Sequence, residues 1–215
     1  PHKGVEPIFS FATVSLLDPG GFKHQELHLD KNGTLIAPVK EELFIREAGL
    51  MAYSQNLQHS PATMRAKGKT LDEPLQDEGL GRMFRVEGEG LVVASPGSEG
   101  RFTVLELYDD FIYLKQEAVF GFETSLYWEN GRIRSTEVEI PLIHLRGEGR
   151  LVMWTSGDIV KTRVQPDHPV RVPGHYLLGW LGRIVPTVRV PSGGEPLTGL
   201  PVLECEGEGV LLLRP

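Results

Sequence analysis

Apolar and polar residues alternate along most of the chain with a period of two. In the stretch KHQELHLD, which ends at Asp30, the leucines fall on one face of an extended segment, and the histidines and acids fall on the other. The same period runs through 101–122, on both sides of the pair Asp109-Asp110. Stretches with the period of a helix are short and weak. We therefore predict an all-β fold, with a turn at Asp109-Asp110.

Two segments do not follow this alternation. Residues 58–81 are polar and have neither a strand period nor a helix period, and 191–200 is a shorter stretch of the same kind. A segment of that length without a period is longer than an ordinary hairpin loop. We predict that 58–81 is a long loop excursion, either mobile or an ordered flap, and that 191–200 is a linker.

Three segments of the chain align with one another without gaps. They share alternating aliphatic residues, then a small residue followed by an aromatic one, and an aliphatic residue at the end. The segments are Leu43–Leu57, Ile112–Leu126 and Val170–Ile184, and their small-aromatic pairs are Ala52-Tyr53, Gly121-Phe122 and Gly179-Trp180. We interpret these pairs as structural positions of a repeated β unit, because a small residue lets a ring from elsewhere lie against the backbone.

The triplet Gly-Glu-Gly also occurs three times at a regular spacing. Its copies begin at Gly88, Gly147 and Gly207, and each is followed by an apolar run. Glycine adopts the positive φ of a tight turn, and a solvated glutamate suits the tip of such a turn. We predict three hairpins, whose tips are Glu89, Glu148 and Glu208.

The two repeated motifs are not distributed equally over the three units. We expect one domain over 1–215 with three pseudo-repeats, namely 84–133, 142–190, and 8–57 completed by 202–215. The first unit lacks a Gly-Glu-Gly hairpin before it, and the last hairpin has nothing after it. We therefore predict that the C-terminal strand pairs with the N-terminal third, which would close the sheet and protect its edges.

These motifs resemble the altered-inheritance-of-mitochondria family, also called the mitochondrial biogenesis family. The resemblance lies in IPLIHLRGEGRLVMW (140–154) and HPVRVPGHYLLGWLGRI (168–184), with weaker echoes around 43–57 and 86–97, and covers most of the chain outside 58–81. It implies the TRAP-like fold (that of the trp RNA-binding attenuation protein), a β-sandwich or barrel related to the double-stranded β-helix and often self-associating. Mitochondrial members are linked to inner-membrane organisation. The family has no defined catalytic residues to carry over.

Charge and composition disfavour several classes of partner. The net charge of −7 opposes binding to nucleic acid, although four arginines could share a face: Arg146, Arg150, Arg171 and Arg183. No apolar run is long enough to span a bilayer. Peripheral membrane association stays open. A single cysteine excludes an intrachain disulfide. We expect a cytoplasmic protein that binds no nucleic acid.

Few residues are arranged for catalysis or metal binding. His24, Glu26 and His28 form a weak metal candidate, but residues four apart on a strand are roughly 13 Å apart, too far for both histidines to bind one ion. Cys205 lies between Glu204 and Glu206, which would raise its pKa and make it a poor nucleophile. We expect no cofactor and no enzymatic activity.

Two functions follow from these observations. The first is a non-enzymatic β scaffold that self-associates and binds an unidentified protein partner. Its interaction surface would comprise 58–81, the glutamates at the three tips, and the aromatic pair Tyr127 and Trp128, because aromatic residues often anchor interfaces. The alternative is a cupin-like metal-dependent enzyme or small-molecule binder that uses the barrel interior, with His24, His28 or His144 as ligands.

Overall fold

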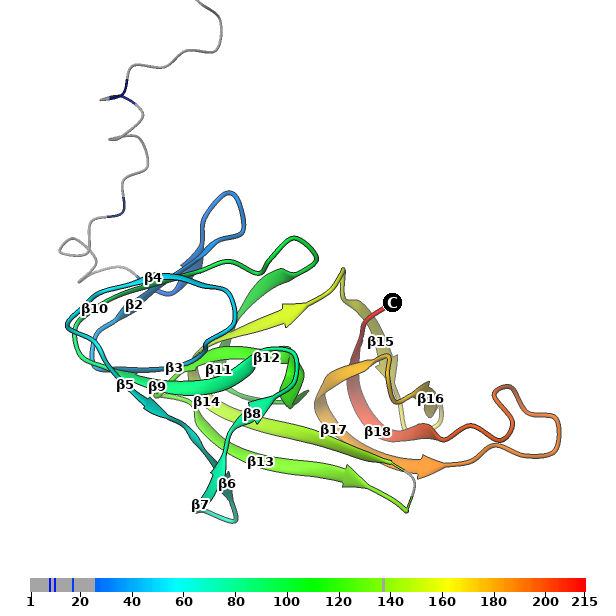
Figure 1. Cartoon of the computed structure of the whole chain (residues 1–215). Coiled ribbons are helices and arrows are strands. Elements are labelled where there is room, and N and C mark those ends of the chain that lie inside the picture. Colours follow the sequence, from blue (N-terminus) through cyan, green and yellow to red (C-terminus); the bar gives the residue numbers. More distant parts are fainter. Residues whose placement is uncertain (1–7, 9, 11–16, 18–25, 137) are drawn as a thin grey trace, which may run out of the picture.

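The computed structural model describes residues 8, 10, 17, 26–136 and 138–215, and within them the fold is all-β, as predicted (Figure 1). A 3-10 helix at Gln116–Ala118 interrupts the strands. The strands of the N-terminal part are β1 (His28–Leu29), β2 (Leu35–Val39), β3 (Glu42–Arg46), β4 (Leu50–Tyr53), β5 (Gln58–Pro61), β6 (Thr63–Ala66), β7 (Lys69–Pro74), β8 (Gln76–Asp77), β9 (Gly81–Glu87) and β10 (Gly90–Ala94). The later strands are β11 (Arg101–Lys115), β12 (Val119–Glu123), β13 (Tyr127–Arg134), β14 (Glu139–Thr155), β15 (Val160–Val164), β16 (Val170–Pro173), β17 (Leu177–Arg189) and β18 (Val202–Leu213).

The strands form three units of the same plan. Each unit ends in a long return strand that carries Gly-Glu-Gly at its centre: β9–β10, β14 and β18. After the triplet, the return strand lies between a first lead strand (β2, the start of β11, β15) and a small-aromatic strand (β4, β12, the start of β17). Before the triplet, it lies between a second lead strand (β3, the end of β11, β16) and a closing strand (β5, β13, the end of β17).

The aligned sequence positions occupy equivalent positions in the three units. Leu43, Ile112 and Val170 each pair with the residue two places before the triplet. The small residues Ala52, Gly121 and Gly179 each pair with the residue three places after it, and the aromatic residues that follow pair with its neighbour. The alignment made from sequence is therefore also the alignment of the hydrogen-bonded ladders.

Each small-aromatic strand also contains an irregularity at the same place. The ladder to the return strand skips Met51 in the first unit, Phe120 in the second and Leu178 in the third. Such a β-bulge bends the strand and increases its twist. The bulge occurs at the equivalent position of all three units, so it is part of the structure of the repeated unit.

The predicted Gly-Glu-Gly hairpins are wrong for all three copies. Gly88–Gly90 joins β9 to β10, which lie in different sheets and do not pair with each other. Gly147–Gly149 and Gly207–Gly209 lie inside β14 and β18, where the long strand passes from one pair of neighbours to the other. A Cβ on Gly207 would lie 2.1 Å from the carbonyl oxygen of Arg183. The glycines therefore permit a close approach of two strands. Glu148 and Glu208 are exposed at mid-strand bends and are not hairpin tips.

Asp109-Asp110 is likewise not a turn between strands. Both residues lie within β11, opposite the triplet of β14, where the register shifts between Leu107 and Asp110. Asp109 has a φ of 56°, in the left-handed region that aspartate tolerates better than most residues. The pair forms a bulge, because β14 continues past it without a break.

The C-terminal strand does not pair with the N-terminal third, which corrects our prediction. β18 pairs with β15, β16 and β17, all in the third unit. The first unit has its own return strand, β9–β10, which comes after the segment 58–81. The units therefore run over about 35–94, 101–155 and 160–213, and each is complete in itself.

Residues 58–81 are ordered, which was one of the two predicted alternatives, but they form strands and not a loop, which corrects the predicted loop excursion. They contain β5 and β8, which pair with β9, and the hairpin β6–β7. Most side chains of β5 and β7 are exposed, so these strands carry no alternating apolar pattern. The hairpin docks on the second unit, where Asn130 accepts a hydrogen bond from the Arg65 N–H at 2.8 Å.

Candidate functional site

The units are joined by strand pairing within one 12-stranded sheet. The small-aromatic strand β12 pairs with β3 of the preceding unit, and β17 pairs with β11 in the same way. In both joints an aromatic residue faces another aromatic residue across the ladder. Phe122 stacks on Phe44 with ring centroids 4.9 Å apart, and Trp180 stacks on Tyr113 at 4.9 Å. We call these two places the internal joints.

The glycine of each small-aromatic pair lets the two backbones approach closely. A Cβ on Gly121 would lie 2.7 Å from the carbonyl oxygen of Phe44, and one on Gly179 would lie 2.1 Å from that of Tyr113. Atoms at such distances overlap. The internal joints are therefore packed too tightly for any residue but glycine at this position.

A buried cation lies in each internal joint. Arg46 is completely buried and donates to the carbonyls of Val119, Gln116 and Gly81 at 3.2, 3.1 and 2.7 Å. Asp77 lies 2.8 Å from the same guanidinium. The equivalent position in the second joint is Lys115, also buried.

Burial shifts both of these cations in the same direction. It lowers the pKa of the Arg46 guanidinium, and Asp77 opposes the shift. Burial likewise lowers the pKa of Lys115, whose Nζ lies 3.5 Å from Glu117. Each of these ion pairs lies within one unit, whereas the hydrogen bonds from Arg46 to the Val119 and Gln116 carbonyls cross the first internal joint.

One end of the array has a small-aromatic strand without a neighbouring unit. Within the described residues, β4 pairs with β10 alone, and its other edge is unpaired. Met51 and Tyr53 are 63 % and 58 % exposed, whereas their counterparts in β12 and β17 are buried. The same structural position is therefore covered in two units and open in the first.

The other end has a second lead strand without a neighbour. Among the described strands, β16 pairs only with β18. Figure 1 places β2, β4 and β10 at one end of the molecule and β15–β18 at the other. We call the outer sides of β4 and β16 the two open edges.

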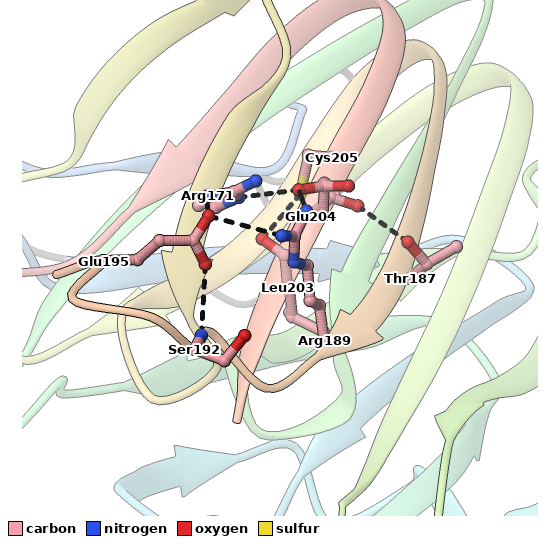
Figure 2. Close-up of polar contacts among 8 residues, drawn as sticks. All are labelled: Arg171, Thr187, Arg189, Ser192, Glu195, Leu203, Glu204 and Cys205. Atoms are coloured by element: carbon pink, nitrogen blue, oxygen red, sulfur yellow. Dashed lines mark hydrogen bonds and ion pairs between the residues drawn. The ribbon is translucent and has the colours of Figure 1, made fainter. Parts of the chain in front are cut away.

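A network of charged side chains lies beside the open edge of β16 (Figure 2). Arg171, on β16, donates to Glu204 at 2.6 Å and to Glu195 at 3.1 Å. Arg189, on β17, reaches the same two carboxylates at 3.2 and 3.3 Å. The Ser192 N–H donates to Glu195.

These contacts keep the network charged. The hydrogen bond from Arg171 lowers the pKa of Glu204, and the Ser192 N–H lowers the pKa of Glu195. The acids that lie next to Arg171 therefore hold its guanidinium in place at the edge. Its side chain stays 40 % exposed.

Cys205 lies behind this network and faces the core. It is completely buried, and burial raises the pKa of its thiol to about 11. We attributed a raised pKa to the neighbouring glutamates, but the cause is desolvation. A thiol with this pKa stays protonated near neutral pH and is a structural residue.

The weak metal candidate does not form a site among the described residues. His24 lies outside them. Glu26 lies 2.5 Å from the Arg150 guanidinium, and the ring of His28 lies 2.7 Å from the Glu26 carbonyl oxygen. No group of three metal-ligating side chains occurs in the part of the chain that the structure describes.

The aromatic pair in β13 is not the exposed surface that we predicted. Trp128 is buried and packs against Phe44 and Phe122 at the first internal joint. Tyr127 is half-buried, with the guanidiniums of Arg65 and Arg146 4.7 and 4.6 Å from its ring centroid. Its position next to the triplet places it between the hairpin β6–β7 and β14. Glu89 is exposed, as an interaction residue needs to be.

Three of the four arginines singled out as a possible RNA-binding face have other partners. Arg150 pairs with Glu26 and Glu106, and Arg146 lies over Tyr127. Arg171 belongs to the network beside β16. Because carboxylates and rings already occupy these three guanidiniums, the structure offers no support for a shared phosphate-binding face.

A hollow of about 600 Å³ lies next to the second internal joint. Its wall includes His144, Tyr113 and Trp180, and the His144 ring stacks on Tyr113 with centroids 4.4 Å apart. Burial, and then the nearby Arg146, lowers the pKa of His144. Glu129 and Arg132 also line the hollow, so it combines an aromatic wall with charged groups.

Sequence reasoning missed the open edges and both buried cations. An edge is defined by the strand that is missing beside it, and no residue type marks that absence. The sequence did contain a signal for the buried cations. Arg46 and Lys115 each follow an aligned aliphatic residue, so two units carry a cation at the same position of the repeat.

The comparisons with known proteins agree with this architecture. The family model described as mitochondrial biogenesis AIM24 matches residues 34–215. A solved structure, that of protein SPYM3_0169 from Streptococcus pyogenes, is similar with a TM-score of 0.65 and 13 % sequence identity. The similarity covers 88 % of this chain and 93 % of that one, and it shows the fold. No curated protein matches. None of the described helices has the length and apolar character to cross a membrane.

Proposed function

The chain belongs to the mitochondrial biogenesis AIM24 family, and from this premise we propose that it is a non-enzymatic β scaffold that self-associates and presents loops to a protein partner. The observation that carries the proposal is the open edge of β4. Met51 and Tyr53 are exposed there, at positions that the other two units bury.

Covering this edge is energetically favourable. Complete burial of a large apolar side chain contributes about 1.5–3 kcal/mol. The edge also presents unpaired backbone groups, which are a ready template for another strand. A second polypeptide paired with β4 would bury the exposed side chains and form hydrogen bonds with the unpaired backbone groups.

The association is tested by light scattering and sedimentation over a dilution series. We expect the mean mass to rise with concentration and to exceed that of one chain at the upper end of the series. A single-chain mass at every concentration would contradict self-association.

The hairpin β6–β7 is the surface that we propose for the protein partner. It projects from the sheet, and its ends meet, because the Leu75 N–H donates to the Ala62 carbonyl at 2.9 Å. Residues 63–74 can therefore be replaced by two glycines without separating these strands. We expect pull-downs from the native cell to lose the partner with this variant but to retain it when only the exposed Glu99 is replaced by glutamine. Equal recovery with the full chain and the shortened chain would rule out the hairpin.

The aromatic hollow favours a second function, binding of a small molecule. A planar ligand would stack on the wall formed by Tyr113 and His144, and Glu129 or Arg132 would contact its polar groups. Native mass spectrometry of the purified protein, with a Tyr113→Ala variant as control, tests for a bound small molecule. Elemental analysis of the same sample tests the metal-dependent alternative.

A further inference from the structure

We infer that copies of this chain join head to tail, with β4 of one copy pairing antiparallel with β16 of the next copy. This inference rests on the proposed self-association and specifies its surface. The joint would repeat, between molecules, the arrangement that links the units within one molecule.

The two open edges are the two halves of an internal joint. The first joint has the strand order β11-β14-β12-β3-β9-β5, in which β12 is the small-aromatic strand and β3 the second lead strand. The ends of the molecule carry β2-β10-β4 and β16-β18-β17. Placing β4 beside β16 restores the same order. The β4 end lacks a second lead strand beside it, and the β16 end lacks a small-aromatic strand beside it.

The internal joints fix the register of the joint between copies. Gly121 pairs with Ile45 in the first joint, and Gly179 pairs with Leu114 in the second. The equivalent residues at the ends are Ala52 and Val172. Tyr53 then lies opposite Arg171, and Ser54 lies opposite Val170.

The chemistry of the facing pair fits this register. The internal joints place Phe122 on Phe44 and Trp180 on Tyr113. The joint between copies places the exposed Tyr53 ring against the Arg171 guanidinium, which stacks well on aromatic faces. Glu204 and Glu195 already hold that guanidinium at the edge, so little side-chain freedom is lost on pairing.

Two departures from the internal joints make the proposed joint weaker. Ala52 has the Cβ that Gly121 and Gly179 lack, so the facing backbones must lie further apart. Pro173 occupies the position of the buried cations Arg46 and Lys115 and has no side-chain donor to reach across the joint as Arg46 does. We therefore expect the joint between copies to be weaker than the internal joints, and reversible.

The joint is tested with two variants, each damaged at one edge. Tyr53→Lys places a like charge opposite Arg171, and Arg171→Glu removes the cation from β16. Analytical ultracentrifugation should show each variant associating at least tenfold more weakly than the wild type. Mixed one to one, they should associate again, because one joint pairs the two intact edges and the other joint places the introduced lysine opposite the introduced glutamate. Ala52→Gly should associate more tightly than the wild type.

Matched substitutions control for damage to the fold. Arg189→Glu breaks the same acidic network as Arg171→Glu but lies on β17, away from the open edge. Tyr108→Lys makes the same substitution at another exposed tyrosine, on β11. Both controls should associate like the wild type, and thermal melts should show all five variants folded.

The outcomes separate this inference from the proposed function. A wild type that associates, with both edge variants unchanged, overturns the head-to-tail joint and leaves the scaffold standing. Edge variants that stay monomeric when mixed also overturn it, since they would indicate a symmetric interface. Association that disappears in a chain starting at residue 26 overturns it by assigning the contact to residues 1–25. A wild type that never associates overturns both proposals.

Discussion

Arg46 shows how much one side chain can contribute to the cohesion of two units. Its guanidinium satisfies three carbonyls and one carboxylate in a fully buried position at the first internal joint. Removing one partner of a buried ion pair leaves the other charge uncompensated, at a typical cost of about 3–5 kcal/mol. We expect Arg46→Ala to lower the free energy of unfolding by this amount in urea denaturation.

The control for this substitution is Arg85, whose ion pair with Glu42 lies on the surface. Surface pairs contribute about 0–1 kcal/mol, so Arg85→Ala should change stability little. Equal losses for the two variants would show that the burial of Arg46 has no special role.

His144 should make the stability of the protein depend on pH. Its pKa in the folded chain is lowered by burial from an ordinary value of 6.5. The unfolded chain therefore takes up the proton first, and stability falls as the pH drops from about 6.5 toward the lower folded value. We expect the melting temperature to fall less for His144→Gln than for the wild type when the pH is lowered from about 7.5 to 5.5. The same substitution at exposed His175 serves as control, and identical slopes for His144→Gln and the wild type would contradict the assignment.

At the scale of the strand, the glycine of the small-aromatic pair determines how closely two units approach. Gly179→Ala would place a methyl group 2.1 Å from a backbone oxygen, and backbone cannot move aside cheaply. We expect a loss of about 1–3 kcal/mol, the usual cost of overpacking, measured by thermal and urea unfolding. Gly131→Ala, on β13, has open space around it and should be tolerated. If both glycines tolerate alanine equally, the joint is not closely packed.

The elements that could be predicted are those whose side chains are buried in a repeated way. Leu43, Ile112 and Val170 revealed the register of three ladders, because burial of alternate residues leaves a pattern in the sequence. The strands within 58–81 left no such pattern, since most of their side chains face solvent. A Gly-Glu-Gly triplet marks either a turn or a bend, and only the length of the partner strand distinguishes the two. The open edges had no residue signature at all.

At the scale of the whole molecule, each unit depends on its own return strand. β18 pairs with three strands of the third unit and supplies much of its core. We expect deletion of 202–215 to unfold the third unit, while the first two keep β9–β10 and β14. Limited proteolysis with mass spectrometry should then recover a resistant fragment that ends near residue 155. Deleting Pro215 alone is the control, and a melting curve like that of the full chain after the long deletion would refute this division into units.

The two open edges differ from each other, and this gives a row of joined copies a direction. A copy that keeps one edge and has lost the other can still enter the row, but nothing can add beyond it. Such a copy acts as a terminator, so a minor fraction of defective chains would shorten every row in a mixed population. A substitution at Tyr53 or Arg171 would then be dominant when expressed beside the normal chain, and its effect would grow with the length that the normal rows reach.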